Sequence, residues 1–282
     1  MKRLLVATDF SNNAFNALLY TTQLFKNEKC KFLLLHSFGQ EISTLTSRVD
    51  IGKREELFDK LLEDSQNRFV ALQSSIEKAN SSTIHSYECI STSMSLTKKV
   101  NELILTNELD MVVMGAIGAT ESSDIFLGSN SVRVIEKITR CPLLIIPKGL
   151  VFSTPKIVAF PTDFKHRYNG SVLKAFKMVT SCYNPTIKVL HIKEEDNLSE
   201  SQRINFKNLT KLLRDTENEI YWIPKSSNKV QLIHEFIEEF DVDILMMVFY
   251  KNNFFKRLTH EQVIKKTAFQ AVIPLMVIPD QV

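Results

Sequence analysis

Three glycines lie close together in a chain that has very few. The stretch Gly115–Ser131, GAIGATESSDIFLGSNS, contains Gly115, Gly118 and Gly128, whereas the 282 residues include seven glycines in all. A glycine lets a ligand approach the backbone closely, because it has no Cβ atom. Serines 129 and 131 would add hydroxyl donors at the predicted start of a helix, where backbone N–H groups and the helix dipole favour an anion. The pattern therefore indicates a phosphate-binding loop.

Two features of this loop leave other interpretations open. It is not a Walker A loop, because no Gly-Lys-Ser/Thr follows, and glycines also mark ordinary turns and helix caps. The stretch contains no Lys or Arg, but it does contain Glu121 and Asp124. Carboxylates repel phosphates unless a metal ion bridges them or the side chains point outward.

The elements that would position this loop follow from the hydrophobic pattern. Short apolar runs alternate with longer amphipathic stretches, and the runs are apolar throughout, as in parallel strands covered by helices on both faces. We expect Ser11 and Ser93 to cap helices. In the first half we predict strands near 3–8, 31–37, 84–90, 110–115 and 142–147, and helices near 12–27, 51–79, 94–107 and 129–139.

The second half of the chain repeats the first. RLLVATDF near the start matches KIVAFPTDF after residue 150, and LDMVVMGA and CPLLIIP match VDILMMVF and IPLMVIP. Asp9 and Asp163 precede His36 and His191 by 27 and 28 positions. Such self-similarity indicates a duplicated domain. We predict domains at 1–149 and 150–282, with second-half strands near 156–161, 186–192, 218–223, 243–249 and 274–279.

The predicted fold class is α/β, with two tandem doubly wound domains. Each domain would be a five-stranded parallel sheet of order 3-2-1-4-5 with helices on both faces. Ligands bind such sheets at the carboxyl ends of the strands, where the winding direction reverses. Asp9 ends the first strand and Gly115 ends the neighbouring fourth strand, so both residues are expected to border one site.

Composition narrows the classes of function. The net charge of +3 comes from 35 basic and 32 acidic residues, which is too balanced to indicate a nucleic-acid or membrane surface. The apolar start stops at Asp9, too early for a signal peptide, and no apolar run reaches the roughly 18 residues of a membrane span. The four cysteines and six histidines lack metal-ligand spacing. We expect a cytoplasmic protein without a metal site.

With these elements in place, the sequence resembles a universal stress protein of the tandem-domain kind. The nucleotide motif of that family is G-x2-G-x9-G-(S/T), and Gly115, Gly118, Gly128 and Ser129 fit it without a gap. VATDFS at 6–11, LLHSF at 34–38 and CPLLIIP also resemble strand ends of the family, and the resemblance covers both halves.

The resemblance implies an adenine nucleotide, ATP or AMP with Mg²⁺ as an option, in the first domain. It also implies a stress-linked regulatory role without catalytic residues, and a pseudo-dimer of the two domains through their last strands, with a homo-oligomer as an option. The matching positions are Ala7, Thr8 and Asp9 at the base and ribose, Ser37 after the second strand, Met114, Gly115, Ile117 and Gly118 along the ribose and phosphates, and Gly128, Ser129 and Asn130 at the phosphate end.

The second domain departs from the motif. Val248 replaces the first glycine, and Phe249, Tyr250, Phe254 and Phe255 would crowd a phosphate, so we expect no nucleotide there. The alternative for the whole chain is a scaffold that kept the fold and lost the ligand. An enzyme is a third option, since slow ATP hydrolysis would need a water-activating group that the sequence does not identify. The charged face of the helix near 51–79 is expected to be plain surface.

Overall fold

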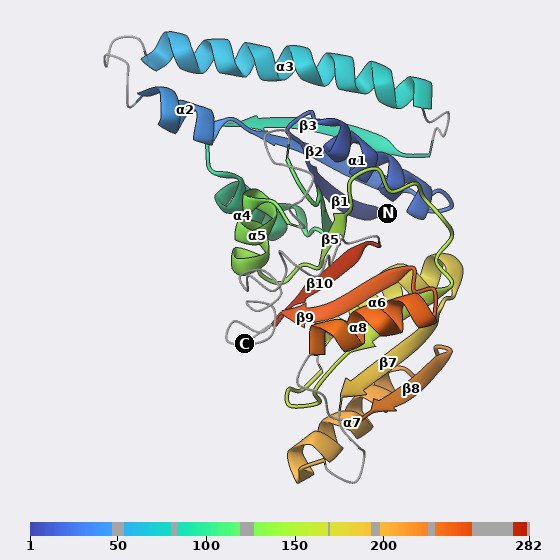
Figure 1. Cartoon of the computed structure of the whole chain (residues 1–282). Coiled ribbons are helices and arrows are strands. Elements are labelled where there is room, and N and C mark those ends of the chain that lie inside the picture. The colour runs from blue at the N-terminus through green and yellow to red at the C-terminus, as the bar shows by residue number, and fades with distance from the viewer. Residues whose placement is uncertain are drawn as a thin grey trace. The chain divides into compact units, whose positions relative to one another are not determined.

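The computed structural model describes residues 1–46, 54–79, 84–118, 127–168, 170–192, 198–224, 229–249 and 273–280. It divides into two compact units, Met1–Val151 and Phe152–Val282. Each unit is an α/β structure built on a parallel sheet (Figure 1). Among the described residues, no helix has the length and apolar character needed to cross a membrane.

The first unit has the predicted strand order, β3-β2-β1-β4-β5, and its strand pairs are parallel. Strand β1 lies in the middle and pairs with both β2 and β4, so the winding reverses beside it. The elements are β1 Lys2–Ala7, α1 Asn12–Leu24, β2 Cys30–Ser37, α2 Gly39–Thr46, α3 Arg54–Ala79, β3 Ser86–Thr92, α4 Leu96–Asn107, β4 Met111–Gly115, α5 Ser129–Lys137 and β5 Leu143–Ile146.

The second unit repeats this order, as β8-β7-β6-β9-β10, again with parallel pairs. The α/β fold class and its tandem duplication are therefore confirmed. The elements are β6 Ile157–Pro161, α6 Gly170–Tyr183, β7 Thr186–Ile192, α7 Glu200–Leu212, β8 Asn218–Ile223, α8 Lys229–Glu239, β9 Ile244–Phe249 and β10 Leu275–Pro279.

One of the two predicted helix caps is wrong. Ser11 caps α1, since its side chain accepts a hydrogen bond from the Ala14 N–H at 3.2 Å. Helix α4, however, has Ser95 rather than Ser93 at its N-cap position, and the Ser95 side chain makes no capping hydrogen bond. The chain before it is held in a turn, because the Thr92 hydroxyl accepts from the Met94 N–H at 3.1 Å. The Ser37 hydroxyl also donates to the Met94 carbonyl, and together the two hydrogen bonds hold the chain so that the helix begins two residues later than predicted. Helix α2 was not predicted.

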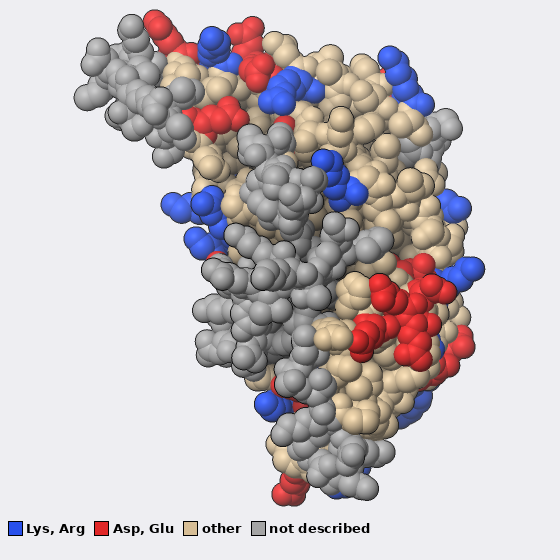
Figure 2. All heavy atoms as spheres, in the orientation of Figure 1, with Lys and Arg blue, Asp and Glu red and all other residues tan. Residues whose placement is uncertain are grey.

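Acidic side chains gather over α8 on the face shown in Figure 2. This helix has the sequence KVQLIHEFIEE, and its Glu235, Glu238 and Glu239 are exposed. Like charges repel, so this part of the second unit does not attract anionic partners.

Each unit uses one aspartate to fasten its central strand. Asp110, just before β4, accepts a hydrogen bond from the Arg3 N–H at 2.9 Å through its side chain. Asp243, just before β9, accepts from the N–H groups of Lys156 and Ile157 at 2.7 and 2.9 Å. The two carboxylates fix the register between the first and fourth strands of each unit, which is the register that sets the site described below.

This role predicts the effect of removing the second aspartate. Asp243→Ala leaves two backbone N–H groups without their charged acceptor and should lower the free energy of unfolding of the second unit by about 1–2 kcal/mol. Urea unfolding followed by the fluorescence of Trp222, the single tryptophan of the chain, reports on this unit. Glu239→Ala removes an equal charge from an exposed position and should change little. Equal effects of the two substitutions would contradict the role given to Asp243.

Candidate functional site

A strained turn follows β1. Phe10 has a φ of 61°, a left-handed conformation that bulky residues seldom adopt. Two local hydrogen bonds hold the turn: the Phe10 N–H donates to the Thr8 hydroxyl at 2.9 Å, and the Ser11 N–H donates to the Asp9 carboxylate at 3.0 Å. Strained backbone of this kind clusters at functional sites.

The same turn follows β6 in the second unit. Phe164 has a φ of 53°, and its N–H donates to the Thr162 hydroxyl at 3.2 Å. The Lys165 N–H donates to the Asp163 carboxylate at 3.0 Å. The duplication therefore preserved the backbone geometry of Thr-Asp-Phe as well as its sequence.

The phenylalanine of each turn is held by aromatic packing. The Phe10 ring lies 4.6 Å from the His36 ring and 5.0 Å from the Phe69 ring of α3, measured between centroids. The Phe164 ring lies 4.5 Å from the His191 ring in the corresponding place. Such contacts add stability beyond the burial of apolar area, and they offset the strain of the left-handed residue.

The structure brings the turn after β1 next to the glycine loop after β4. A Cβ atom on Gly118 would lie 3.1 Å from Oδ2 of Asp9. The two strands are hydrogen-bonded neighbours, with Val6 paired to Val113, so their carboxyl ends meet here. We call the predicted residues at these ends and at the start of α5 the switch-point site; they are Ala7, Thr8, Asp9, Ser37, Met114, Gly115, Ile117, Gly118, Gly128, Ser129 and Asn130.

Gly115 serves a different purpose from the one expected. A Cβ atom there would lie 2.6 Å from Nδ2 of Asn13 and 3.2 Å from its backbone carbonyl carbon. Asn13 is buried in the first turn of α1, and its side-chain amide donates to the Ile117 carbonyl at 2.8 Å. The bare backbone at Gly115 is therefore used by the protein's own Asn13 rather than left open to a ligand.

The start of α5 is tied back to the end of β4. The Gly128 N–H donates to the Ala116 carbonyl at 2.7 Å. The Ser131 hydroxyl is buried and lies 3.1 Å from the carbonyl oxygens of both Gly115 and Ala116. The expectation that Ser131 offers a donor to a ligand is therefore wrong, because the chain uses that donor itself.

The other predicted residues occupy a variety of positions. Ser129 and Asn130 begin α5 with exposed side chains, whereas Ala7, Met114 and Ile117 are buried. The Ser37 hydroxyl donates to the Met94 carbonyl at 2.7 Å and so fastens the loop after β3 to the end of β2. Glu121 and Asp124 lie outside the described residues, as do Tyr250, Phe254 and Phe255.

Two residues at the site were not predicted from the sequence. Asn13 is the second residue of α1 and gives no signal of its own in the sequence. Arg68 lies on the face of α3 that was expected to be plain surface, yet its guanidinium covers the Phe10 ring at 4.4 Å from the centroid and donates to the Asp9 carbonyl at 3.3 Å. Arg68 directly precedes Phe69, which lies on the apolar stripe of the helix. A residue beside such a stripe is expected at the edge of the face that packs on the sheet, and this was the signal in the sequence.

A buried polar chain runs beneath α3. Nδ1 of His36 lies 2.8 Å from the Ser65 hydroxyl, which lies 2.7 Å from the Ser91 hydroxyl of β3. Burial and then the Arg68 guanidinium lower the pKa of His36 to about 4, against the smaller opposing effects of Asp9 and Asp64. His36 is therefore neutral at physiological pH and acts as a hydrogen-bonding and stacking group.

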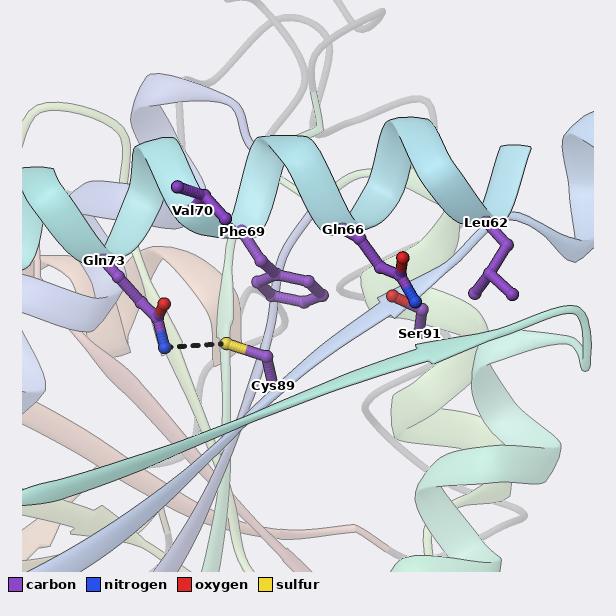
Figure 3. Close-up of a pocket in the computed structure, with 7 residues that line it drawn as sticks. All are labelled: Leu62, Gln66, Phe69, Val70, Gln73, Cys89 and Ser91. Atoms are coloured by element: carbon purple, nitrogen blue, oxygen red, sulfur yellow. Dashed lines mark hydrogen bonds between the residues drawn. The ribbon is translucent and has the colours of Figure 1, made fainter. Parts of the chain in front are cut away.

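A pocket of about 320 Å³ lies between α3 and β3 (Figure 3). Its lining includes Phe69, Cys89 and Ser91, and Gln73 donates to the Cys89 sulfur at 3.6 Å. Burial and the neighbouring Glu88 raise the pKa of the Cys89 thiol, which disfavours the nucleophilic thiolate. The described residues contain no group of three or more His, Cys, Asp or Glu placed to hold a metal ion.

The contact between Gly115 and Asn13 predicts a coupling between two substitutions. Gly115→Ala places a methyl group against the Asn13 amide and should lower the free energy of unfolding of the first unit by about 1–3 kcal/mol. Asn13→Ala removes the obstructing side chain, so the double variant should lose less than the sum of the single losses. Urea unfolding of the three variants, followed by circular dichroism, measures the coupling. Strict additivity would contradict the contact.

The lowered pKa of His36 predicts acid sensitivity of the first unit. Between pH 6.5 and pH 4 the unfolded chain binds a proton at His36 that the folded unit does not, so stability falls as the pH is lowered through this range. From pH 7 to pH 5 the loss from this residue should be about 2 kcal/mol. His36→Gln should remove most of that pH dependence, whereas His191→Gln in the second unit should leave it in place. Circular dichroism during urea unfolding, with Trp222 fluorescence reporting the second unit separately, measures it; an unchanged dependence in His36→Gln would exclude this cause.

Comparisons with known proteins agree with this architecture. A universal stress protein from Archaeoglobus fulgidus is 19% identical, with a TM-score of 0.66, over 98% of each chain. A protein of unknown function from Pseudomonas aeruginosa is 11% identical, with a TM-score of 0.54, over 99% of this chain and 92% of that one. The cytoplasmic domain of a prokaryotic cation chloride cotransporter is 10% identical, with a TM-score of 0.51, over 98% and 94%. At these identities the likeness shows the fold alone.

No curated protein sequence matches the chain. The model of the universal stress protein family matches residues 1–147, which include the whole switch-point site. That match covers more than half of the 282 residues. The chain therefore belongs to the universal stress protein family.

Proposed function

We propose that the first unit binds an adenine nucleotide, ATP or AMP, at the switch-point site. The observation that carries the proposal is the approach of Asp9 to Gly118, where a single added Cβ atom would lie 3.1 Å from the carboxylate. Bare backbone beside a polar side chain at the carboxyl ends of two adjacent parallel strands is the setting in which doubly wound sheets bind nucleotides. The unbroken G-x2-G-x9-G-S spacing of the family motif supports the same ligand.

Different groups at the site would contact different parts of the nucleotide. The Asp9 carboxylate and the backbone around Thr8 would accept hydrogen bonds from the ribose or base, and Gly118 would let the ligand pass close to the chain. The start of α5, with exposed Ser129 and Asn130, would face the phosphates, since the dipole of a helix is positive at its N-terminus. Mg²⁺ would supply charge that neutralises the phosphates, and the need for it is settled by titration with and without the ion.

The second unit supports a stoichiometry of one nucleotide per chain. The Thr162 hydroxyl, which corresponds to that of Thr8, is hydrogen-bonded to the buried Tyr168. The Asp163 carboxylate lies 3.7 Å from the Lys165 ammonium, whereas Ser11 occupies the matching position in the first unit. The chain's own groups thus contact the atoms that a ligand would use, and Val248 lies near the end of β9 where the first unit has Gly115.

The role that fits such a site is regulation by an adenine nucleotide in the cytoplasm rather than catalysis. The Ser65 hydroxyl and the His36 ring are hydrogen-bonded near this turn, but both are buried, unlike the accessible nucleophile that a catalytic triad requires. Pairing of the two units through β5 and β10 stays a prediction of the sequence, as does a homo-oligomer. The other candidate is a scaffold without ligand, which the acidic Glu121 and Asp124 of the loop favour.

Calorimetric titration of the purified chain with ATP and with AMP, each with and without Mg²⁺, tests the proposal. Binding should saturate near one equivalent per chain. Gly118→Val should weaken it at least tenfold, because the added side chain occupies the space beside Asp9. Gly170→Val is the matched control, since a Cβ atom at Gly170 meets nothing within 4 Å.

Three outcomes would contradict parts of the proposal. Two equivalents would show that the second unit also binds. Unaltered affinity in Gly118→Val would place the ligand elsewhere. No binding of either nucleotide under any condition would favour the scaffold.

A further inference from the structure

Arg68 is the cation that the structure brings to the turn after β1. It lies on α3, and its guanidinium contacts both the Phe10 ring and the Asp9 carbonyl. Its side chain keeps 43% of its surface exposed, so it is anchored by the turn and still open to solvent. The exposed Asp64 carboxylate lies 3.9 Å away on the same helix, a surface pair that neutralises little of the charge.

The second unit provides an internal comparison. Helix α7 follows β7 as α3 follows β2, and Gln202 of α7 donates to the Asp163 carbonyl, as Arg68 donates to the Asp9 carbonyl. Gln202 is buried, with 7% of its surface exposed. A neutral amide is thus sufficient to hold the helix against the turn. Gln202 occupies a different position on its helix, because Phe206 contacts Phe164 as Phe69 contacts Phe10, which matches Arg68 to Asn205. Charge and exposure nevertheless distinguish the contact that Arg68 makes from that of Gln202.

The negative charge at the switch-point site is one that Arg68 could offset. The motif stretch from Gly115 to Ser131 contains two carboxylates and no Lys or Arg, and Asp9 adds another negative charge beside Gly118. A nucleotide with one phosphate carries about two negative charges, and ATP carries about four. An anion approaching the Asp9 carboxylate meets repulsion unless a nearby cation offsets it.

We propose that Arg68 supplies the positive charge that makes the switch-point site favourable for an anionic nucleotide. The inference rests on the function proposed above and adds a residue that determines the charge preference of the site. Hydrogen bonding to Asp9 positions the guanidinium, and the exposed part of the side chain faces the ligand's charge.

The decisive substitution is Arg68→Gln, because glutamine keeps a side-chain N–H donor and removes the positive charge. We expect a loss of affinity that grows with ligand charge: about tenfold for ATP, a few-fold for AMP and none for adenosine, with the ATP effect reduced at high salt. Arg68→Lys should keep most of the ATP affinity, because it keeps the charge. Arg214→Gln makes the same change in net charge at an exposed position of the second unit and should have no effect.

Equal losses for the three ligands in Arg68→Gln would overturn the proposal, because they would show that Arg68 acts by shaping the site rather than through its charge. An unchanged ATP affinity would overturn it as well.

A measurement without ligand separates this inference from the proposed function. The Arg68 guanidinium helps to lower the pKa of His36, so NMR titration of the His36 ring should show a higher pKa in Arg68→Gln than in the parent protein. If the parent binds none of the three ligands while the His36 pKa rises, the proposed function fails and the electrostatic position of Arg68 stands. If the pKa does not move, the charge of Arg68 does not act at this turn, and the inference fails by itself.

Discussion

The left-handed backbone of Phe10 is the constraint on which the arrangement of the first unit depends. It turns the chain sharply at the end of β1, so that Asp9 faces the glycine loop and the Phe10 ring enters the layer beneath α3. An unfavourable conformation persists only when its surroundings determine it, and here the Thr8 hydroxyl, the His36 ring and the Phe69 ring do so. The same turn therefore determines both the position of Asp9 at the proposed site and the packing of the Phe10 ring against α3.

The two units show which contacts the duplicated fold requires. The aspartate before the fourth strand, the Thr-Asp-Phe turn and the histidine beneath its ring occur in both. These contacts hold the central strand and its exit, so losing one would damage either unit. Arg68 and Gln202 instead differ in charge and burial, although each reaches the carbonyl of the aspartate in its turn. Contacts that serve the fold were kept in both units, and those that could serve a ligand diverged.

Much of this could be predicted from the sequence, because buried parallel strands are apolar throughout and the strand order places Asp9 near the glycine loop. The strands from β1 to β10 lie within a few residues of the predicted ranges. What could not be predicted depends on contacts between distant segments. Helix α4 begins after Ser95 because the preceding loop is hydrogen-bonded to the end of β2. Gly115 packs against Asn13, and the Ser131 hydroxyl donates to the backbone at the end of β4. Arg68 resembled any exposed arginine until the fold placed it over Phe10.

Helix α3 is long, and the residues by which it contacts the site lie near its midpoint. Its 26 residues span about 39 Å at the usual rise, and Ser65, Arg68 and Phe69, which contact the site and its neighbours, lie near its midpoint. Buried side chains are found from Ser65 to Ile76, whereas residues 55–64 are exposed or half-buried. A tilt of about 5° at the midpoint would move the first turn by roughly 1.5 Å, given that rise per residue. A change at the turn after β1 would thus be amplified at the far end of the helix, where another molecule could detect it.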